Sequence, residues 1–129
     1  MISKVVSTPK TYELSQRFYF EAAHTLLREI ETESSRRIHG HTYEAEVTVR
    51  GQPDPETGMV IDLAILREHI QAVRHLLDHQ FLDEIEGLGP PTLENLCAFI
   101  LEKLGHNVEC LASVSVWRQA SGDRSTVVL

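Results

Sequence analysis

Apolar and polar residues alternate along two stretches in the first half of the chain. In residues 11–23 the apolar side chains Leu14, Phe18 and Phe20 share one parity, and tyrosine and phenylalanine are frequent. Residues 39–50 repeat the pattern, with apolar residues at odd positions and Glu, Thr or Arg at even ones from 44 onward. Because successive side chains of a strand point to opposite faces, each stretch predicts a strand with one buried face.

The middle of the chain changes to a helical period. Leu66, Ile70, Val73 and Leu77 recur at three- and four-residue spacing after Asp62, a good N-cap, which predicts a helix over residues 63–76. Thr92 is the expected cap of a second helix, whose apolar stripe lies at positions 93, 96, 97, 100, 101 and 104 and which Gly105 would end.

The remaining segments connect these elements. Residues 25–37 are polar and weakly periodic, which indicates a loop, and residues 81–91 indicate a second loop rich in glycine and proline. Residues 53–58 form a turn-rich run, after which residues 59–61 resume an extended path. Residues 110–117 and 125–129 read as a hairpin around Ser121-Gly122-Asp123. The order β-β-α-α-β-β predicts an α+β domain with two helices on one face of a four-stranded antiparallel sheet.

Length and charge narrow the class of protein. The 129 residues are expected to form one domain, residues 1–129, with residues 1–10 as a loose amino-terminal segment. The formal net charge of -7 argues against nucleic acid or an anionic membrane surface as a partner. No apolar run has the length of a membrane span, and residues 1–10 lack a signal-peptide core, so we expect a cytoplasmic protein.

Three histidines form the main candidate for chemistry. His39 and His41 flank Gly40 and project to the same face of the second strand, while His24 has the parity of the buried face of the first strand. Three neutral imidazoles are the ligand set of an open zinc site, in which a fourth position remains for water or substrate. The alternative is that the two histidines around Gly40 are a chance pair among the seven histidines of the chain.

Several motifs occur in an order that resembles that of a known protein family. From about Tyr12 to Trp117 the chain resembles the 6-pyruvoyl-tetrahydropterin synthase and 6-carboxytetrahydropterin synthase family, the latter being its queuosine-pathway branch. The landmarks are Phe20-Glu21-Ala22-Ala23-His24, His39-Gly40-His41, Thr57-Gly58-Met59-Val60-Ile61-Asp62, Leu77-Asp78-His79-Gln80-Phe81-Leu82 and Pro91-Thr92-Leu93-Glu94-Asn95-Leu96.

The resemblance implies a fold, an assembly and an activity. The fold would be the tunnelling fold (T-fold), assembled as a homohexamer of two stacked trimers whose sheets join into a barrel with active sites between subunits. The protein would be a zinc-dependent lyase that binds zinc through His24, His39 and His41. Its substrate would be 7,8-dihydroneopterin triphosphate or a related pterin. The queuosine branch makes 6-carboxytetrahydropterin with loss of acetaldehyde and triphosphate.

The proton relay of the family maps onto Asp78 and His79. A carboxylate can orient an imidazole and stabilise its charged form, which gives a general acid or base near neutral pH. Without the resemblance, Asp78 would read as the end of a helix and His79 as a surface residue.

The chain departs from the family at the position of its cysteine, which is Ser35 here. A serine hydroxyl is far less acidic than a thiol and does not form the anion that accepts a proton at neutral pH. Ser35 could still relay a proton, or Glu31 or Glu33 of the same loop could be the base. The alternative is that this loop is simply solvated.

A second departure is Arg118, which follows Trp117 where the family has a pterin-anchoring glutamate. A guanidinium donates hydrogen bonds and cannot accept those of the amino-pyrimidinone edge of a pterin. Either Asp123 or Glu94 replaces the acceptor, or the ligand is a carboxylate or phosphate rather than a pterin. A surface ion pair is the plainer role. Arg118, Glu94 and Thr92 are the expected substrate contacts.

Three functions remain open on the sequence. The first is the zinc-dependent lyase with a modified base. The second is a paralogue with the same fold, zinc site and oligomer that acts on a different anionic small molecule. The third is a non-catalytic binding protein in which zinc ties a loop to a strand.

Overall fold

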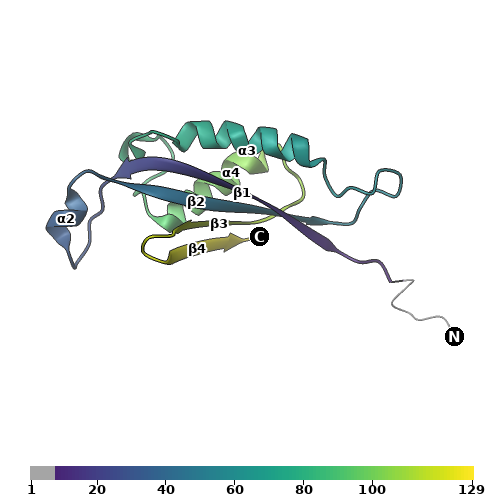
Figure 1. Ribbon diagram of the computed structural model, residues 1–129, viewed down its shortest axis with the longest axis horizontal. Helices are drawn as coiled ribbons and strands as arrows, with labels where there is room; N and C mark the ends of the chain where they lie inside the picture. Colours follow the sequence, from purple (N-terminus) through teal and green to yellow (C-terminus); the bar gives the residue numbers. More distant parts are fainter. Residues whose placement is uncertain (1–7) are drawn as a thin grey trace.

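A single antiparallel sheet and two helices make up the body of the molecule (Figure 1). The computed structural model describes residues 8–129, so residues 1–7 of the loose segment expected at 1–10 lie outside the described residues. The sheet has the order β1-β2-β3-β4, from β1 (Tyr12–His24), β2 (His39–Gly51), β3 (Leu111–Arg118) and β4 (Asp123–Val128). The predicted α+β architecture is confirmed.

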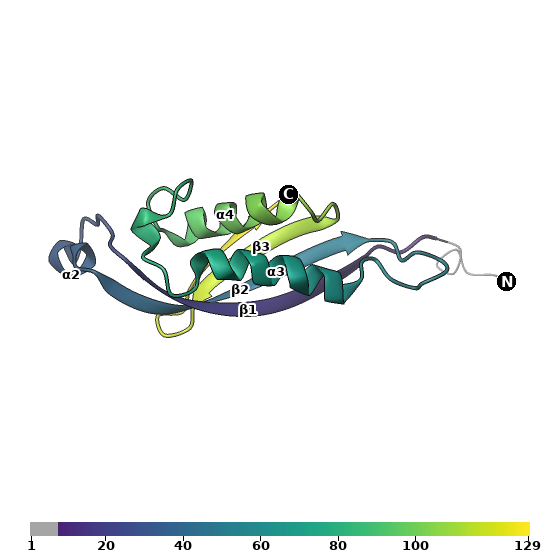
Figure 2. The same ribbon diagram turned by 90° about the horizontal axis from the view of Figure 1, so that it is seen from above.

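Both long helices lie on the same face of the sheet. α3 (Leu63–Leu77) packs on β1, and α4 (Leu93–Gly105) packs on β3 and β4, which gives two layers (Figure 2). Asp62 accepts a hydrogen bond from the Ala64 backbone N–H, and Thr92 accepts one from the Asn95 N–H, so both predicted caps are confirmed. Among the described residues, no helix is long and apolar enough to cross a membrane.

The hydrophobic core lies between the two layers. Phe18, Phe20 and Ala22 are buried on β1, and Tyr43 is buried at the matching end of β2, as the alternation predicted. The rings of Phe20 and Tyr43 stack with their centroids 5.0 Å apart. The core therefore extends along the sheet up to the end that carries the histidines.

The connections contain structure that their composition does not reveal. Residues 25–37, expected to be a loop throughout, include the short helix α2 (Thr32–Arg36), and the expectation of an irregular segment is wrong there. This helix begins after Glu31, whose backbone carbonyl accepts from the Ser35 N–H. Residues 81–91 include a 3-10 turn, η1 (Leu82–Glu84). Five residues give little room for a helical period, which explains why α2 has no sequence signal.

One further pairing extends the sheet at its β1 edge. The His79 N–H donates to the Glu21 carbonyl, and the Ala23 N–H donates to the Gln80 carbonyl. Phe81 continues this contact as a parallel bridge to Ala23. The segment after α3 is thereby fixed against the end of β1, beside the histidines.

Candidate active site

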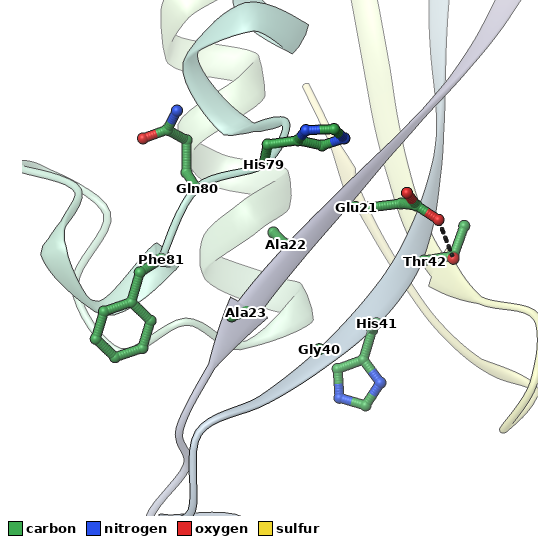
Figure 3. A pocket seen from close by; sticks show the side chains of 9 residues that line it. All are labelled: Glu21, Ala22, Ala23, Gly40, His41, Thr42, His79, Gln80 and Phe81. Carbon is green, nitrogen blue, oxygen red and sulfur yellow. Dashed lines mark hydrogen bonds between the residues drawn. The ribbon is translucent and has the colours of Figure 1, made fainter.

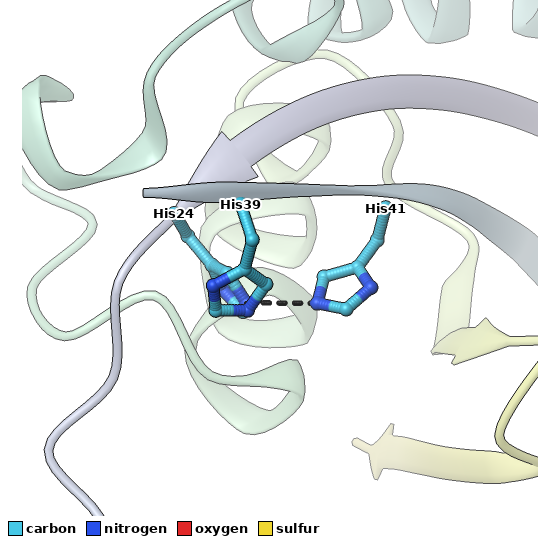
Figure 4. A group of neighbouring side chains, drawn as sticks. All are labelled: His24, His39 and His41. Atoms are coloured by element: carbon cyan, nitrogen blue, oxygen red, sulfur yellow. Dashed lines mark hydrogen bonds between the residues drawn. The ribbon is translucent and has the colours of Figure 1, made fainter. Parts of the chain in front are cut away.

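His24, His39 and His41 meet at one end of the sheet (Figure 4). The antiparallel register places His24 directly opposite His39 and Ala22 opposite His41, so both β2 histidines reach the end of β1. His24 Nε2 lies 2.9 Å from His39 Nε2 and 3.0 Å from His41 Nε2. One ligand atom from each ring lies within 4.8 Å of the others, so the three could hold one metal ion.

The hydrogen bonds of Nδ1 in His24 and in His39 determine which ring nitrogen is free to bind a metal. His24 Nδ1 lies 3.0 Å from the Pro91 carbonyl oxygen, and His39 Nδ1 lies 2.8 Å from the Arg37 carbonyl oxygen. A carbonyl only accepts, so each Nδ1 carries the hydrogen and each neutral ring has a bare Nε2. Two bare nitrogens 2.9 Å apart repel unless a cation lies near both. The donor set therefore fits a metal, with backbone carbonyls as outer partners.

Burial also favours the neutral form of two of the rings, His24 and His41. It lowers the pKa of His41 to about 4, and the nearby charges of His24, Arg118 and His39 add to this effect. Burial is also the largest cause that lowers the pKa of His24, and the hydrogen bond to Pro91 opposes it. Neutral imidazoles are the form that binds a metal.

The metal-free protein is expected to lose stability as the pH falls from about 6.5 toward 4. In this window the unfolded chain protonates His41 while the folded chain, with a pKa of about 4, does not, so the free energy of unfolding falls. After allowance for solvent screening the loss is on the order of 1–2 kcal/mol. Urea denaturation in chelator at pH 7 and pH 5 measures it.

The His41→Gln variant should lose less stability over that range than the unaltered protein. His75→Gln, on the exposed side of α3, is the matched control and should behave as the unaltered protein does. An equal pH dependence in all three proteins would exclude His41 as the cause.

Arg118 points toward the triad. Its Nη1 lies 3.4 Å from His41 Nε2, its Nη2 donates to Asp123 Oδ2 at 2.9 Å, and 17% of its side chain is exposed. The ion pair expected as the plainer role of Arg118 is present, with Asp123 as the partner. Both residues of this pair also line a pocket.

This pocket has a volume of about 380 Å³ and lies beside His24. The structure brings the three expected substrate contacts together here, since Thr92, Glu94 and Arg118 all line it. Thr92 and Glu94 come from the start of α4, and Arg118 comes from the end of β3. The other lining residues are Leu26, Leu27, Arg28, Tyr43, Pro91, Leu93 and Asp123. We call this the triad pocket.

His79 belongs to a different pocket, of about 550 Å³, which Asp78 does not line (Figure 3). His79 lines it together with Glu21 and Thr42, which have the parity opposite to the buried face, and His41 also borders it. Asp78 ends α3, and His79 has a positive φ of 59° and a side chain that is 76% exposed. His79 is therefore open to solvent or to a partner, and the triad pocket does not include it.

The Asp78 carboxylate is held firmly. Its Oδ1 accepts from the Glu21 backbone N–H at 2.9 Å, and its Oδ2 lies 3.3 Å from Arg74 Nη2 and 3.8 Å from His79 Nε2. The hydrogen bond from Glu21 is the largest cause that lowers the pKa of Asp78, and the charges of Arg74 and His79 act in the same direction. Asp78 is thus an ionised group beside an imidazole.

Ser35 and Glu33 lie on α2, in the connection between β1 and β2. Ser35 is 5% exposed and its carbonyl accepts from the Leu26 N–H, whereas Glu33 is exposed. Neither is among the described residues that line the two pockets. Within this one chain, the structure does not bring them to the triad.

Some residues of the site were not predicted from the sequence. The carbonyls of Pro91 and Arg37 orient two of the histidines, and Tyr43 places its hydroxyl 3.1 Å from His24 Nδ1. Burial is the largest cause that raises the pKa of Tyr43, so it remains a neutral phenol. Tyr43 shares the parity of His41, and this shared parity was the one sign in the sequence that Tyr43 could lie at the site. A backbone carbonyl leaves no such sign in the sequence.

Comparison with known proteins adds independent information. The family model of 6-pyruvoyl tetrahydropterin synthase matches residues 13–126. A 6-carboxy-5,6,7,8-tetrahydropterin synthase from Synechocystis is 37% identical over 108 residues, covering 74% of this chain and 82% of that protein. A dihydroneopterin monophosphate aldolase from Pyrococcus furiosus is 33% identical over 104 residues, covering 78% and 84%.

A solved structure agrees with these sequence matches. The 6-pyruvoyl tetrahydropterin synthase of Caenorhabditis elegans superposes with a TM-score of 0.81 at 28% identity, covering 94% of this chain and 97% of that chain. The similarity therefore extends over almost the whole length of both proteins.

Proposed function

The chain belongs to the 6-pyruvoyl tetrahydropterin synthase family and has its T-fold, and from this premise we propose that it is a zinc-dependent lyase. Its substrate is 7,8-dihydroneopterin triphosphate or a related pterin. The family consists of pterin-processing synthases and aldolases, which supports an enzyme rather than a non-catalytic binding protein. The observation that carries the proposal is the convergence of three imidazole Nε2 atoms beside the triad pocket.

The metal site consists of His24, His39 and His41. Three neutral nitrogen donors are typical of a zinc site, and a zinc ion held by them would have a fourth position for water or substrate. Zinc bound there would polarise hydroxyl and carbonyl oxygens of the substrate, so that protons on adjacent carbons become removable. The chain itself contributes the orientation of the rings, through the Pro91 and Arg37 carbonyls.

Asp78 and His79 are the proposed proton carriers. The ionised Asp78 carboxylate, with its Oδ2 3.8 Å from His79 Nε2, would stabilise the charged form of the imidazole, and His79 is the group that we assign as general acid or base. The exposure of His79 supports this role, because a proton carrier must reach a ligand.

The position of the family cysteine requires a different group. Ser35 can pass a proton through its hydroxyl but does not hold a negative charge at neutral pH. Glu33, one turn of α2 away from Arg36, is the carboxylate we assign as the base. Both groups lie on a segment that projects from the body of the fold (Figure 1), so docking of another subunit could place them at a site.

We propose that the site lies between subunits of a homohexamer built from two trimers. Three observations support this assembly: His79 does not line the triad pocket, α2 projects outward, and large apolar side chains are exposed around α2. Leu27 is 83% exposed and Ile30 is 77% exposed, which is a large apolar area for a polar segment to leave in water.

The test of the proposed function is turnover by the zinc-loaded protein. Protein loaded with a single equivalent of zinc is expected to consume 7,8-dihydroneopterin triphosphate, or a dihydroneopterin with fewer phosphates, with product identified by mass spectrometry. Protein stripped of metal by a chelator serves as the control, and zinc should restore its activity. Absence of turnover with every pterin tested, at stoichiometric zinc, would contradict the proposal.

A further inference from the structure

The guanidinium of Arg118 lacks some of its hydrogen-bond partners, although only 17% of the side chain is exposed. Its Nη2 has Asp123 as a partner, but its Nη1 has only the long contact to His41 Nε2. Among the buried side-chain nitrogen and oxygen atoms of the described residues, Arg118 Nε is the one without a hydrogen-bond partner. An unpaired buried donor is costly, so this guanidinium has capacity for a further acceptor.

The charges around the triad pocket show which acceptor would fit. Arg28 and Arg118 carry positive charge, Glu94 and Asp123 carry negative charge, and these side chains balance formally. A divalent ion on the triad therefore adds two positive charges that the pocket side chains leave uncompensated. The start of α4 lies on the same pocket and adds the positive end of a helix dipole.

We propose that the ligand of this site places an anionic oxygen group, a carboxylate or a phosphate, between Arg118 and the open coordination position of the metal. The inference rests on the metal site of the proposed function and specifies which part of the ligand lies at Arg118. The planar guanidinium matches carboxylate and phosphate oxygens and cannot accept the N–H groups of a pterin edge. A pterin substrate would thus turn its acidic substituent, rather than its amino-pyrimidinone edge, toward Arg118.

The same geometry makes anion and metal binding favour each other. Without an anion, Arg118 Nη1 lies 3.4 Å from His41 Nε2, the nitrogen that faces the other two imidazoles, and its charge opposes a cation there. An anion on Arg118 draws the guanidinium away from His41 and neutralises its charge. By linkage, a group that raises metal affinity must itself bind more tightly when the metal is present.

Metal titration of the purified protein tests this coupling. Cobalt(II) is the probe, because its visible absorption reports coordination, and methylphosphonate and acetate are the two anion probes, which distinguish phosphate from carboxylate. We expect at least one of them to tighten cobalt binding about tenfold, within the usual range of coupling between sites. The Arg118→Gln variant should bind cobalt more tightly without anion and lose the coupling.

Three further variants make the test directional. Asp123→Asn removes the carboxylate that competes for Arg118 and should strengthen anion binding severalfold. Arg124→Gln, on the neighbouring strand with its guanidinium over Trp117, removes the same charge outside the pocket and should leave the coupling unchanged. Arg118→Glu introduces an acceptor and should favour uncharged 7,8-dihydroneopterin over both anions.

The outcomes separate this inference from the proposed function. The inference is overturned if neither anion alters cobalt affinity, or if Arg118→Gln retains the coupling. If the anion inference is overturned in this way but the unaltered protein still turns over a pterin, the proposed function stands without the inference. If the unaltered protein binds no cobalt at all, both are overturned.

Discussion

The His24→Ala variant is expected to lose metal binding and turnover together. His24 is the central member of the triad, because both other rings contact its Nε2, and it is 2% exposed. Metal affinity should fall by at least about a hundredfold, since even outer partners of a metal ligand contribute tenfold to a hundredfold. Metal analysis of the purified variant, with the pterin assay in parallel, measures both effects.

The effect on folding must be separated from the effect on metal. Removal of a buried ring leaves a cavity and an unpaired Pro91 carbonyl, which is expected to cost on the order of 2 kcal/mol. The circular dichroism spectrum and melting temperature of His24→Ala therefore accompany the assay, and His75→Ala on α3 serves as the histidine control. A folded His24→Ala variant that keeps its metal would refute the assignment of this ligand.

The His79→Ala variant is expected to lose turnover while it retains metal. A positioned general acid or base contributes roughly a hundredfold to ten-thousandfold to a rate, so kcat should fall by that order. His79 is exposed and its side chain supports no core packing, so the melting temperature should change little. Asp78→Asn should lower kcat less and shift the pH profile, because Asp78 acts on the charged form of His79.

Mixing the two variants tests where the site lies. If the triad of one subunit works with His79 of another, oligomers assembled from His24→Ala and His79→Ala chains regain part of the activity that each lacks alone. Gln80→Ala, at the adjacent exposed position, is the control for His79 and should remain active. Mixed oligomers with no more activity than the separate variants would place both functions in one chain.

Alternation along the chain was sufficient to predict the strands and the meeting of the three histidines. The period of two placed Phe20, Ala22 and His24 on one face of the first strand, and Tyr43 and His41 on one face of the second, and in the structure these residues share the buried face of the sheet. The observed register keeps both core faces buried, since a strand that slips by one residue would expose its whole core face. The helices were predicted equally well, because both have a strong apolar period and a side chain that caps the first turn.

Features set by tertiary contacts were beyond the sequence. The pairing of residues 79–81 with β1 uses backbone groups, which leave no mark on residue identity. The Pro91 carbonyl that orients His24 is invisible for the same reason. Arg118 was recognisable as an unusual residue for the family, but its direction toward His41 depends on how β3 lies beside β2.

The most direct test of the central claim is metal analysis of protein purified without any exposure to chelator, combined with X-ray absorption at the zinc edge. The account predicts a single zinc ion per chain with three imidazole nitrogens at about 2.0–2.1 Å and one further oxygen ligand from water or substrate. Protein that contains no zinc and takes up none, or zinc with a shell that does not change when His39 and His41 are replaced, would contradict it.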